Sequence, residues 1–233
     1  MSVDSVAGRP TRRERQRRQT LAEIKTRAVD QVAAGGAESV SLNAIARAMG
    51  MSPAALYRYF ASRDALLAEL VADAYGSLAD ALTVAASGGG GAHGALVAVA
   101  HAYRDWALAN PNSYLLIFQT RSGSGLELEP ERVVAAAQRS MDVILSALGG
   151  AAGAELGPEL AAQVEAWGQR SQVPGLAAGQ RYLGLLAWTR LHGLISLELG
   201  QHLTATGVDP ALLYEAEVQS LLRTARLSSG QPA

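Results

Sequence analysis

Two short apolar stripes with helical spacing follow each other closely near the start of the chain. Ser41, a good helix-capping residue, precedes the first stripe, and Gly50 follows it, where glycine readily adopts a helix-ending left-handed turn. These flanking residues predict a short helix over 42–49. Its apolar positions recur at intervals of three and four, as on one helix face: Leu42, Ile45, Ala46 and Met49.

A second short helix is predicted directly after the first, over 53–60. Ser52 is its capping residue, and Pro53 stands at the first helical position, where the missing N–H costs nothing. Leu56 and Phe60 are four residues apart and can face inward together. Two short helices joined by a tight Gly-Met-Ser turn form a helix-turn-helix, in which the second helix enters the major groove of DNA.

Small and polar side chains occupy the outward face of this second helix. Alanines let a backbone approach DNA closely, while phenol and guanidinium groups reach phosphates and base edges. The alternative is a purely structural three-helix motif with exposed tyrosines, because the same arrangement also occurs without DNA. The candidate DNA-contacting residues are Arg12, Arg13, Ser41, Asn43, Ser52, Pro53, Ala54, Ala55, Tyr57, Arg58, Tyr59 and Arg63.

The run MSPAALYRYFASRDALLAEL resembles the DNA-binding domain of the tetracycline-repressor (TetR) family of bacterial transcriptional regulators. The Gly-x-Ser turn, the segment LYRYF and the following SRDALL fit the family pattern without a gap. Many members carry lysine at the position of Arg63, and arginine keeps that charge. The resemblance covers residues 20–70 and implies a DNA-binding function.

Charge is divided unevenly along the chain, although its formal net value is −1. Residues 1–70 contain 11 lysines and arginines against 7 acidic residues, and the remainder contains 9 against 14. Six arginines fall within 9–18, which predicts a mobile basic segment that lies along phosphates or in the minor groove. We therefore expect a flexible basic arm over 1–18, a helix-turn-helix domain over 19–68 and a C-terminal domain over 69–233.

Longer apolar stripes predict helices on both sides of the helix-turn-helix. The first runs from Thr11 or Glu14 to Ala34. The second runs over 64–86 without an internal proline, so it is expected to act as one rigid rod between the DNA-binding unit and the next domain. The run SGGGG over 87–91 is expected to end this helix as a flexible connector.

The rest of the chain alternates between helical patterns and Gly/Pro breaks. The fold class is therefore all-α, with an N-terminal three-helix domain, a larger helical C-terminal domain and about nine to ten helices in total. A Gly/Ser loop is expected over 121–130. The predicted C-terminal helices are 93–109, a short helix after Asn110-Pro111, 131–148, 158–172, 180–201 and 210–227.

Two C-terminal segments resemble the tryptophan-histidine-glycine type of TetR C-terminal domain. They are WALANPNSYLLIF, over 106–118, and AWTRLHGLISLELG, which carries Trp188, His192 and Gly193 at the signature positions. The resemblance implies an internal cavity for a small-molecule effector. It also implies a homodimer built through the last two predicted helices, 180–201 and 210–227, as a two-fold four-helix bundle.

The implied function is transcriptional regulation, as a repressor that a small-molecule effector releases from its operator. Two recognition helices in a dimer meet successive major grooves, so the operator is expected to be a pseudo-palindrome. The effector would shift the long 64–86 helix and change the separation of the recognition helices. The alternative function is a small-molecule-binding or scaffold protein that has lost DNA binding.

Aromatic side chains are scarce in this chain, and most of those in the C-terminal part are candidates for the effector pocket. The whole chain has 3 Trp, 7 Tyr and 2 Phe. Each candidate can equally be ordinary core. Together they favour an apolar or aromatic effector. The candidate pocket residues are Tyr103, Trp106, Tyr114, Phe118, Met141, Trp167, Trp188 and His192.

Composition excludes several kinds of site. The chain has no cysteine, which excludes disulfides, thiolate metal sites and cysteine nucleophiles and fits a reducing cytoplasm. Its four histidines are not paired at metal-ligand spacing and no catalytic motif is present, so we expect no metal, no cofactor and no enzymatic activity. No segment predicts a signal peptide or a membrane span, so we expect a cytoplasmic protein that does not enter the membrane.

Overall fold

The computed structural model describes residues 11–119, 130–169 and 171–227, and in these ranges the chain is all-helical. Ten α-helices and two short 3-10 segments occur there, and no strand does, so the predicted all-α class is confirmed. Within the same ranges no helix is both long enough and apolar enough to cross a lipid bilayer. The described chain forms two compact units, which meet in sequence between Leu70 and Val71.

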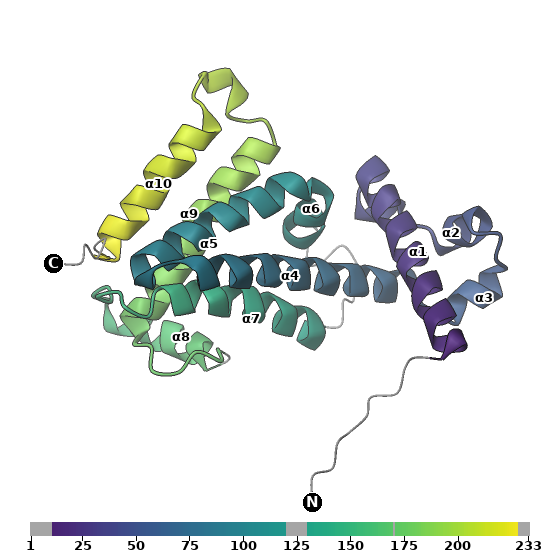
Figure 1. Ribbon diagram of the computed structural model, residues 1–233, viewed down its shortest axis with the longest axis horizontal. Helices are drawn as coiled ribbons and strands as arrows, with labels where there is room; N and C mark the ends of the chain where they lie inside the picture. Colours follow the sequence, from purple (N-terminus) through teal and green to yellow (C-terminus); the bar gives the residue numbers. More distant parts are fainter. Residues whose placement is uncertain (1–10, 120–129, 170, 228–233) are drawn as a thin grey trace, which may run out of the picture. The chain divides into compact units, whose positions relative to one another are not determined.

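The first unit is built from three helices and the start of a fourth (Figure 1). They are α1 (Arg12–Gly35), α2 (Leu42–Ala48), α3 (Pro53–Tyr57) and the first turns of α4 (Arg63–Gly88). A short 3-10 segment, η1 (Ala37–Ser39), connects α1 to α2. The buried side chains of this unit include Ile24, Ala28, Val32, Leu42, Ile45, Ala46, Leu56, Phe60, Leu66 and Leu67.

The helix α1 begins at Arg12, within the segment 1–18 that was predicted to be a flexible arm. The Thr11 hydroxyl accepts a hydrogen bond from the Glu14 N–H at 3.2 Å, and the Glu14 carboxylate accepts one from the Thr11 N–H at 2.7 Å. This reciprocal capping satisfies backbone donors at the helix start. Residues 12–18 are therefore helical, and the prediction of a flexible arm is wrong for them. The rest of the predicted arm, residues 1–10, lies outside the described residues.

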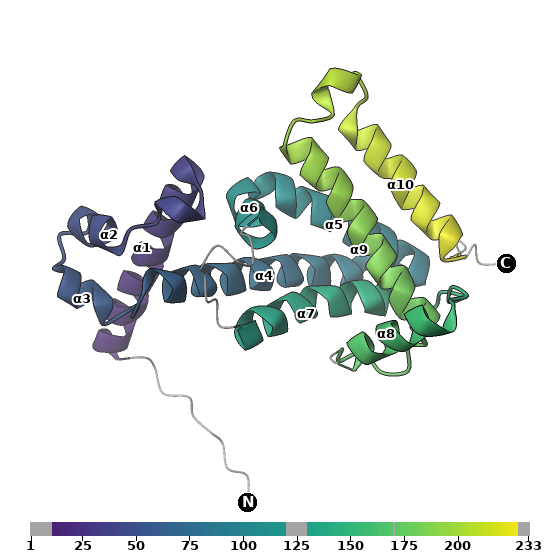
Figure 2. The same ribbon diagram turned by 180° about the vertical axis from the view of Figure 1, so that it is seen from behind.

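The second unit contains the remainder of α4 and six further helices. Both views show α9 and α10 running side by side, and α7 running alongside α4 (Figures 1 and 2). The short 3-10 segment η2 (Thr204–Thr206) lies between α9 and α10. The helices are α5 (Gly91–Ala109), α6 (Pro111–Gln119), α7 (Pro130–Ala147), α8 (Pro158–Gly168), α9 (Ala178–Leu199) and α10 (Pro210–Thr224).

The glycine run over 87–91 ends α4 as predicted, but the predicted five-residue connector is wrong. The helix α4 continues through Gly88 and α5 starts at Gly91, so only two residues separate them. A Cβ added to Gly89 would lie 2.4 Å from the backbone nitrogen of Ala95, which shows how tightly this turn is packed. Glycine is needed there because two backbones approach closely, and not as a flexible spacer. Of the predicted Gly/Ser loop, residues 121–129 lie outside the described residues, and Pro130 begins α7.

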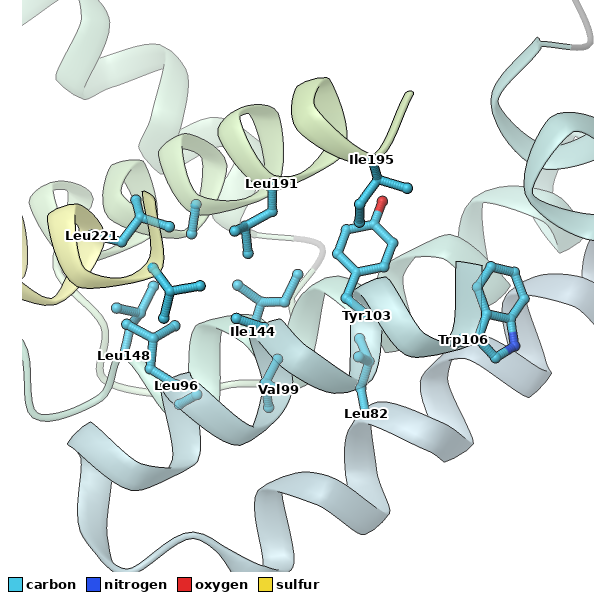
Figure 3. Packing of buried hydrophobic residues seen from close by; sticks show 14 of the residues in the cluster. Leu82, Leu96, Val99, Tyr103, Trp106, Ile144, Leu148, Leu191, Ile195 and Leu221 are labelled. Atoms are coloured by element: carbon cyan, nitrogen blue, oxygen red, sulfur yellow. The ribbon is translucent and has the colours of Figure 1, made fainter. Parts of the chain in front are cut away.

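The core of the second unit is aliphatic over most of its length. Figure 3 shows side chains from five helices meeting there: Leu82, Val99, Ile144, Leu191 and Leu221. The helix α9 approaches α7 closely at Gly184. A Cβ added to this glycine would lie only 2.5 Å from Leu145 Cδ2. Gly184 therefore serves the packing of two helices within the second unit.

Candidate functional site

The turn between α2 and α3 has the predicted local structure. The Ser41 hydroxyl accepts a hydrogen bond from the Ala44 N–H at 3.3 Å, and the Ser52 hydroxyl accepts one from the Ala55 N–H at 3.2 Å. Gly50 has a φ of +64°, in the left-handed region that glycine enters at little cost. Both caps and the glycine turn are thus confirmed, and they hold α3 directly after α2.

The helix α3 is shorter than the predicted 53–60. It ends at Tyr57, and Phe60 is already beyond the helix. The chain must then turn, because the Ser62 hydroxyl accepts a hydrogen bond from the Ala65 N–H at 3.0 Å and so caps α4. Leu56 and Phe60 are nevertheless both buried, so they anchor the segment from behind as predicted.

The outward side of α3 presents a tyrosine and an arginine to solvent. Tyr57 is 47% exposed, and Arg58 is exposed beside it. Tyr59 is half-buried, and the guanidinium carbon of Arg17 lies 5.6 Å from its ring centroid. This cation–π contact brings an arginine of α1 next to the reading segment. Arg17 was not among the candidate DNA contacts, although it belongs to the arginine-rich segment over 9–18.

Arg63 is held inside the first unit. Its guanidinium donates to the Ala37 carbonyl oxygen at 3.1 Å and to the Glu38 carboxylate at 3.1 Å. It therefore ties the start of α4 to the segment after α1, and its predicted phosphate contact stays a prediction. Of the other candidates, the exposed ones are Arg12, Arg13, Asn43, Ser52, Pro53, Ala54, Tyr57 and Arg58, and the half-buried ones are Ser41, Ala55 and Tyr59.

The second unit contains a partly open cavity of about 310 Å³, lined by side chains of helices α4 to α9. Its wall combines aromatic, aliphatic and a few polar side chains, as ligand pockets commonly do. The predicted pocket residues that line it are Tyr103, Phe118, Met141, Trp167 and Trp188. The lining residues that the sequence prediction missed are Tyr75, Leu78, Leu82, Val134, Ala137, Gln138, Ser140, Ile144 and Leu185. All of these residues except Leu185 lie on α4 or α7.

Three predicted pocket residues do not line this cavity. The indole N–H of Trp106 donates to the Ser77 hydroxyl at 3.0 Å, which ties α5 to α4. Tyr114 is fully buried, and its hydroxyl lies 2.8 Å from Nδ1 of His192. Both side chains are buried, but neither of them lines the cavity.

His192 forms a layer directly behind the cavity wall. Its ring centroid lies 4.4 Å from that of Phe118 and 5.8 Å from that of Trp188, and both of these rings line the cavity. Burial lowers the pKa of His192 below its usual value of 6.5, because the charged imidazolium loses hydration. A neutral His192 therefore links the wall of the cavity to the hydroxyl of Tyr114.

The described part of the cavity wall is uncharged. Among the described residues the wall contains no aspartate, glutamate, lysine, arginine or histidine. Burial raises the pKa of Tyr75 to about 12 and places that of Tyr103 well above the usual value of 10, so both phenols stay protonated at neutral pH. The described chain also contains no group of three or more metal-ligating side chains that could hold an ion.

Comparison with known families matches both units. Residues 24–70 match the family described as bacterial regulatory proteins, tetR family. Residues 96–221 match the tetracyclin repressor-like C-terminal domain. The second match contains the candidate pocket residues from Tyr103 to His192.

Individual relatives support the same assignment. The HTH-type transcriptional regulator Rv1816 of Mycobacterium tuberculosis is 33% identical over 206 residues, covering 80% of this chain and 84% of the relative. The HTH-type transcriptional regulator Mb1846 of Mycobacterium bovis matches with the same values.

Solved structures resemble the whole fold. The regulatory protein SCO4313 superposes with a TM-score of 0.80 at 44% identity, over 91% of this chain and 99% of that one. The transcriptional regulator FadR from Bacillus subtilis, solved with stearoyl-CoA, superposes with a TM-score of 0.60 at 14% identity, over 86% and 96%. At that identity the likeness to FadR concerns the fold alone. With both units matched and close relatives over most of its length, the chain belongs to the TetR family of DNA-binding transcriptional regulators.

Proposed function

We propose that this regulator is a repressor that a small-molecule effector releases from a pseudo-palindromic operator. The proposal rests on the course of α4. This helix follows α3 in the sequence, and further along it contributes Tyr75, Leu78 and Leu82 to the cavity wall. One continuous helix thus belongs to both the DNA-binding unit and the cavity. FadR, a regulator of the same fold, was solved with a bound small molecule, which is consistent with an effector here.

In the DNA-binding unit, the exposed face of α3 would enter the major groove. Tyr57 and Arg58 would contact base edges and phosphates, and the alanines before them let the backbone come close. Arg12 and Arg13, both exposed in the first turn of α1, would contact phosphates of the flanking backbone. Arg17, placed against Tyr59, would join them.

Two copies would pair through α9 and α10, within the predicted segments 180–201 and 210–227. The outward side of this helix pair carries large apolar side chains, including Leu197 and Leu212, which is 70% exposed. Gly193 on the same side has no atom within 4 Å of an added Cβ, so it leaves room for a neighbouring helix. A two-fold pair would present two copies of α3 to two half-sites.

Effector binding would change operator affinity by moving α4. Its first turns are fastened to the DNA-binding unit by Arg63, and Glu69 forms a salt bridge with Lys25 of α1 at 2.9 Å. A shift of α4 at the cavity would therefore displace α1 and its neighbours. An effector can do this only if it binds the released conformation more tightly than the DNA-bound one.

The proposal is tested by selecting bound fragments from bacterial genomic DNA and measuring their affinity by fluorescence anisotropy. We expect one pseudo-palindromic sequence and its release by a cavity ligand. A chain that binds small molecules but no DNA would instead be the scaffold protein of the alternative function. Because the proposed operator is chromosomal, the proposed site of action is the bacterial cytoplasm.

A further inference from the structure

The neutral wall of the cavity restricts the charge of its ligand. A carboxylate or phosphate inside it would lose part of its hydration and meet no cationic side chain among the described lining residues. The acyl-CoA type of ligand seen in the FadR structure carries several such groups. An uncharged molecule loses far less on entering this cavity.

The size and the aromatic lining restrict the shape of the ligand. A volume of about 310 Å³ corresponds to the liquid volume of roughly ten water molecules, which accommodates a compact ligand of on the order of ten to fifteen non-hydrogen atoms. Phe118, Trp167 and Trp188 offer ring faces and edges to it. Aromatic rings pack well against such surfaces, in stacked or edge-to-face arrangements. Two linked or fused rings fit both requirements.

The side-chain amide of Gln138 is a polar group of the cavity wall, and its hydrogen bonding determines which end faces a ligand. Its amide nitrogen donates to the Asp142 carboxylate at 2.9 Å. That carboxylate also accepts from the Ser171 hydroxyl at 2.7 Å and from the Gln172 N–H at 3.1 Å. An ionised carboxylate only accepts hydrogen bonds, so it must face the NH₂ end of the Gln138 amide. The carbonyl oxygen of Gln138 is then the end left for a ligand, and it has no partner among the described residues.

We propose that the cavity selects an uncharged, two-ring aromatic molecule that carries a hydrogen-bond donor, which the Gln138 carbonyl oxygen accepts. Asp142 is the positioning residue, because it sets the direction of the Gln138 amide without lining the cavity. The proposal rests on the effector role of the cavity proposed above. It adds the chemical class of the ligand and identifies the side chain that accepts a hydrogen bond from it.

The first test compares the affinities of matched probes for the full-length protein by calorimetry. Para-phenylphenol has a hydroxyl donor, and para-phenylanisole replaces it with a methoxy group that cannot donate. We expect the phenol to bind about tenfold more tightly, the usual value of one such hydrogen bond. Para-phenylbenzamide and para-phenylbenzoate have nearly the same shape and differ in charge. We expect the benzoate to bind more than about a hundredfold more weakly.

Variants then assign the selectivity to the two residues. Gln138→Leu should bind the anisole as well as the wild type does and lose the preference for the phenol. Asp142→Asn should reduce that preference, because an asparagine can also donate and so lets the Gln138 amide turn over. Asp80→Asn, at an exposed acid of α4 outside the cavity, is the matched control and should keep it. Retained anisole affinity shows that a variant is folded.

Equal affinities for the phenol and the anisole would overturn the proposal, and so would tight binding of the benzoate. Failure of every probe would also overturn the ligand class. The effector role would survive that result if another small molecule released the operator. Loss of the phenol preference in the Asp80→Asn control would refute the assignment to Asp142.

Discussion

The hydroxyl oxygen of Tyr114 lies 2.8 Å from Nδ1 of His192 and so joins α6 to α9 inside the second unit. The same hydroxyl lies 2.8 Å from Oγ of Ser196, one turn further along α9. Replacing Tyr114 with phenylalanine leaves these buried polar atoms without their shared partner. We expect Tyr114→Phe to lower the free energy of unfolding by about 1–3 kcal/mol, measured by urea denaturation. Tyr57→Phe, at an exposed tyrosine, should leave it unchanged.

Acidification should destabilise the protein through His192. Because burial lowers the folded-state pKa of His192, the unfolded chain takes up its proton at a higher pH than the folded chain does. The stability contributed by the neutral ring is complete above the usual pKa of 6.5 and is lost as pH falls towards the folded-state value. His192→Asn keeps an acceptor but does not titrate, so its unfolding free energy should fall less between pH 7 and 5. A parallel fall in both proteins would contradict this assignment.

Alanine at Tyr57 or Arg58 should weaken operator binding without affecting folding. Both side chains are exposed on the segment proposed to enter the major groove. We expect a loss of about 1–3 kcal/mol in specific binding for a base contact. If Arg58 contacts a phosphate, the salt dependence of binding should also fall by about 0.9 in slope. Arg139→Ala, at an exposed arginine of α7, is the control, and a loss of the same size there would argue against a specific role for α3.

A side chain at Gly184 should destabilise the second unit. An added Cβ would lie 2.5 Å from Leu145 Cδ2, so Gly184→Ala forces α7 and α9 apart or displaces Leu145. We expect destabilisation of about 1–3 kcal/mol in thermal or urea unfolding. Gly76→Ala, also within a helix, meets its nearest atom at an ordinary 3.9 Å and should stabilise by about 0.5–1 kcal/mol through helix propensity. Equal effects at both glycines would show that α7 and α9 do not pack this closely.

A charge at Leu212 should disrupt the proposed dimer. Leu212 is 70% exposed on α10, and burying a glutamate there against an apolar partner would be unfavourable. We expect Leu212→Glu to sediment as a monomer with unchanged helix content and to bind the operator more weakly. Val84→Glu, at a 76% exposed valine of α4, should keep the oligomeric state of the wild type. A dimeric Leu212→Glu variant would place the interface elsewhere.

Sequence alone predicted the helix-turn-helix well, because the interactions that define it are local. The hydroxyls of Ser41 and Ser52 bond to backbone N–H groups three residues away, and Gly50 adopts its left-handed turn between them. Such caps depend on neighbours in sequence and need no knowledge of the rest of the chain. The same locality explains why α1 begins directly after Thr11, because the capping pair of Thr11 and Glu14 overrides the disorder expected of an arginine-rich segment.

Only the tertiary structure decided which aromatic side chains face the cavity. Tyr114 and Phe118 are four residues apart on α6, and both face inward, yet only Phe118 reaches the empty space. Trp188 and His192 divide in the same way on α9. Helical spacing determines that such pairs share a face. Which residue of such a pair lines the cavity depends on how helices distant in sequence pack against the shared face. Local sequence patterns carry no information on that packing.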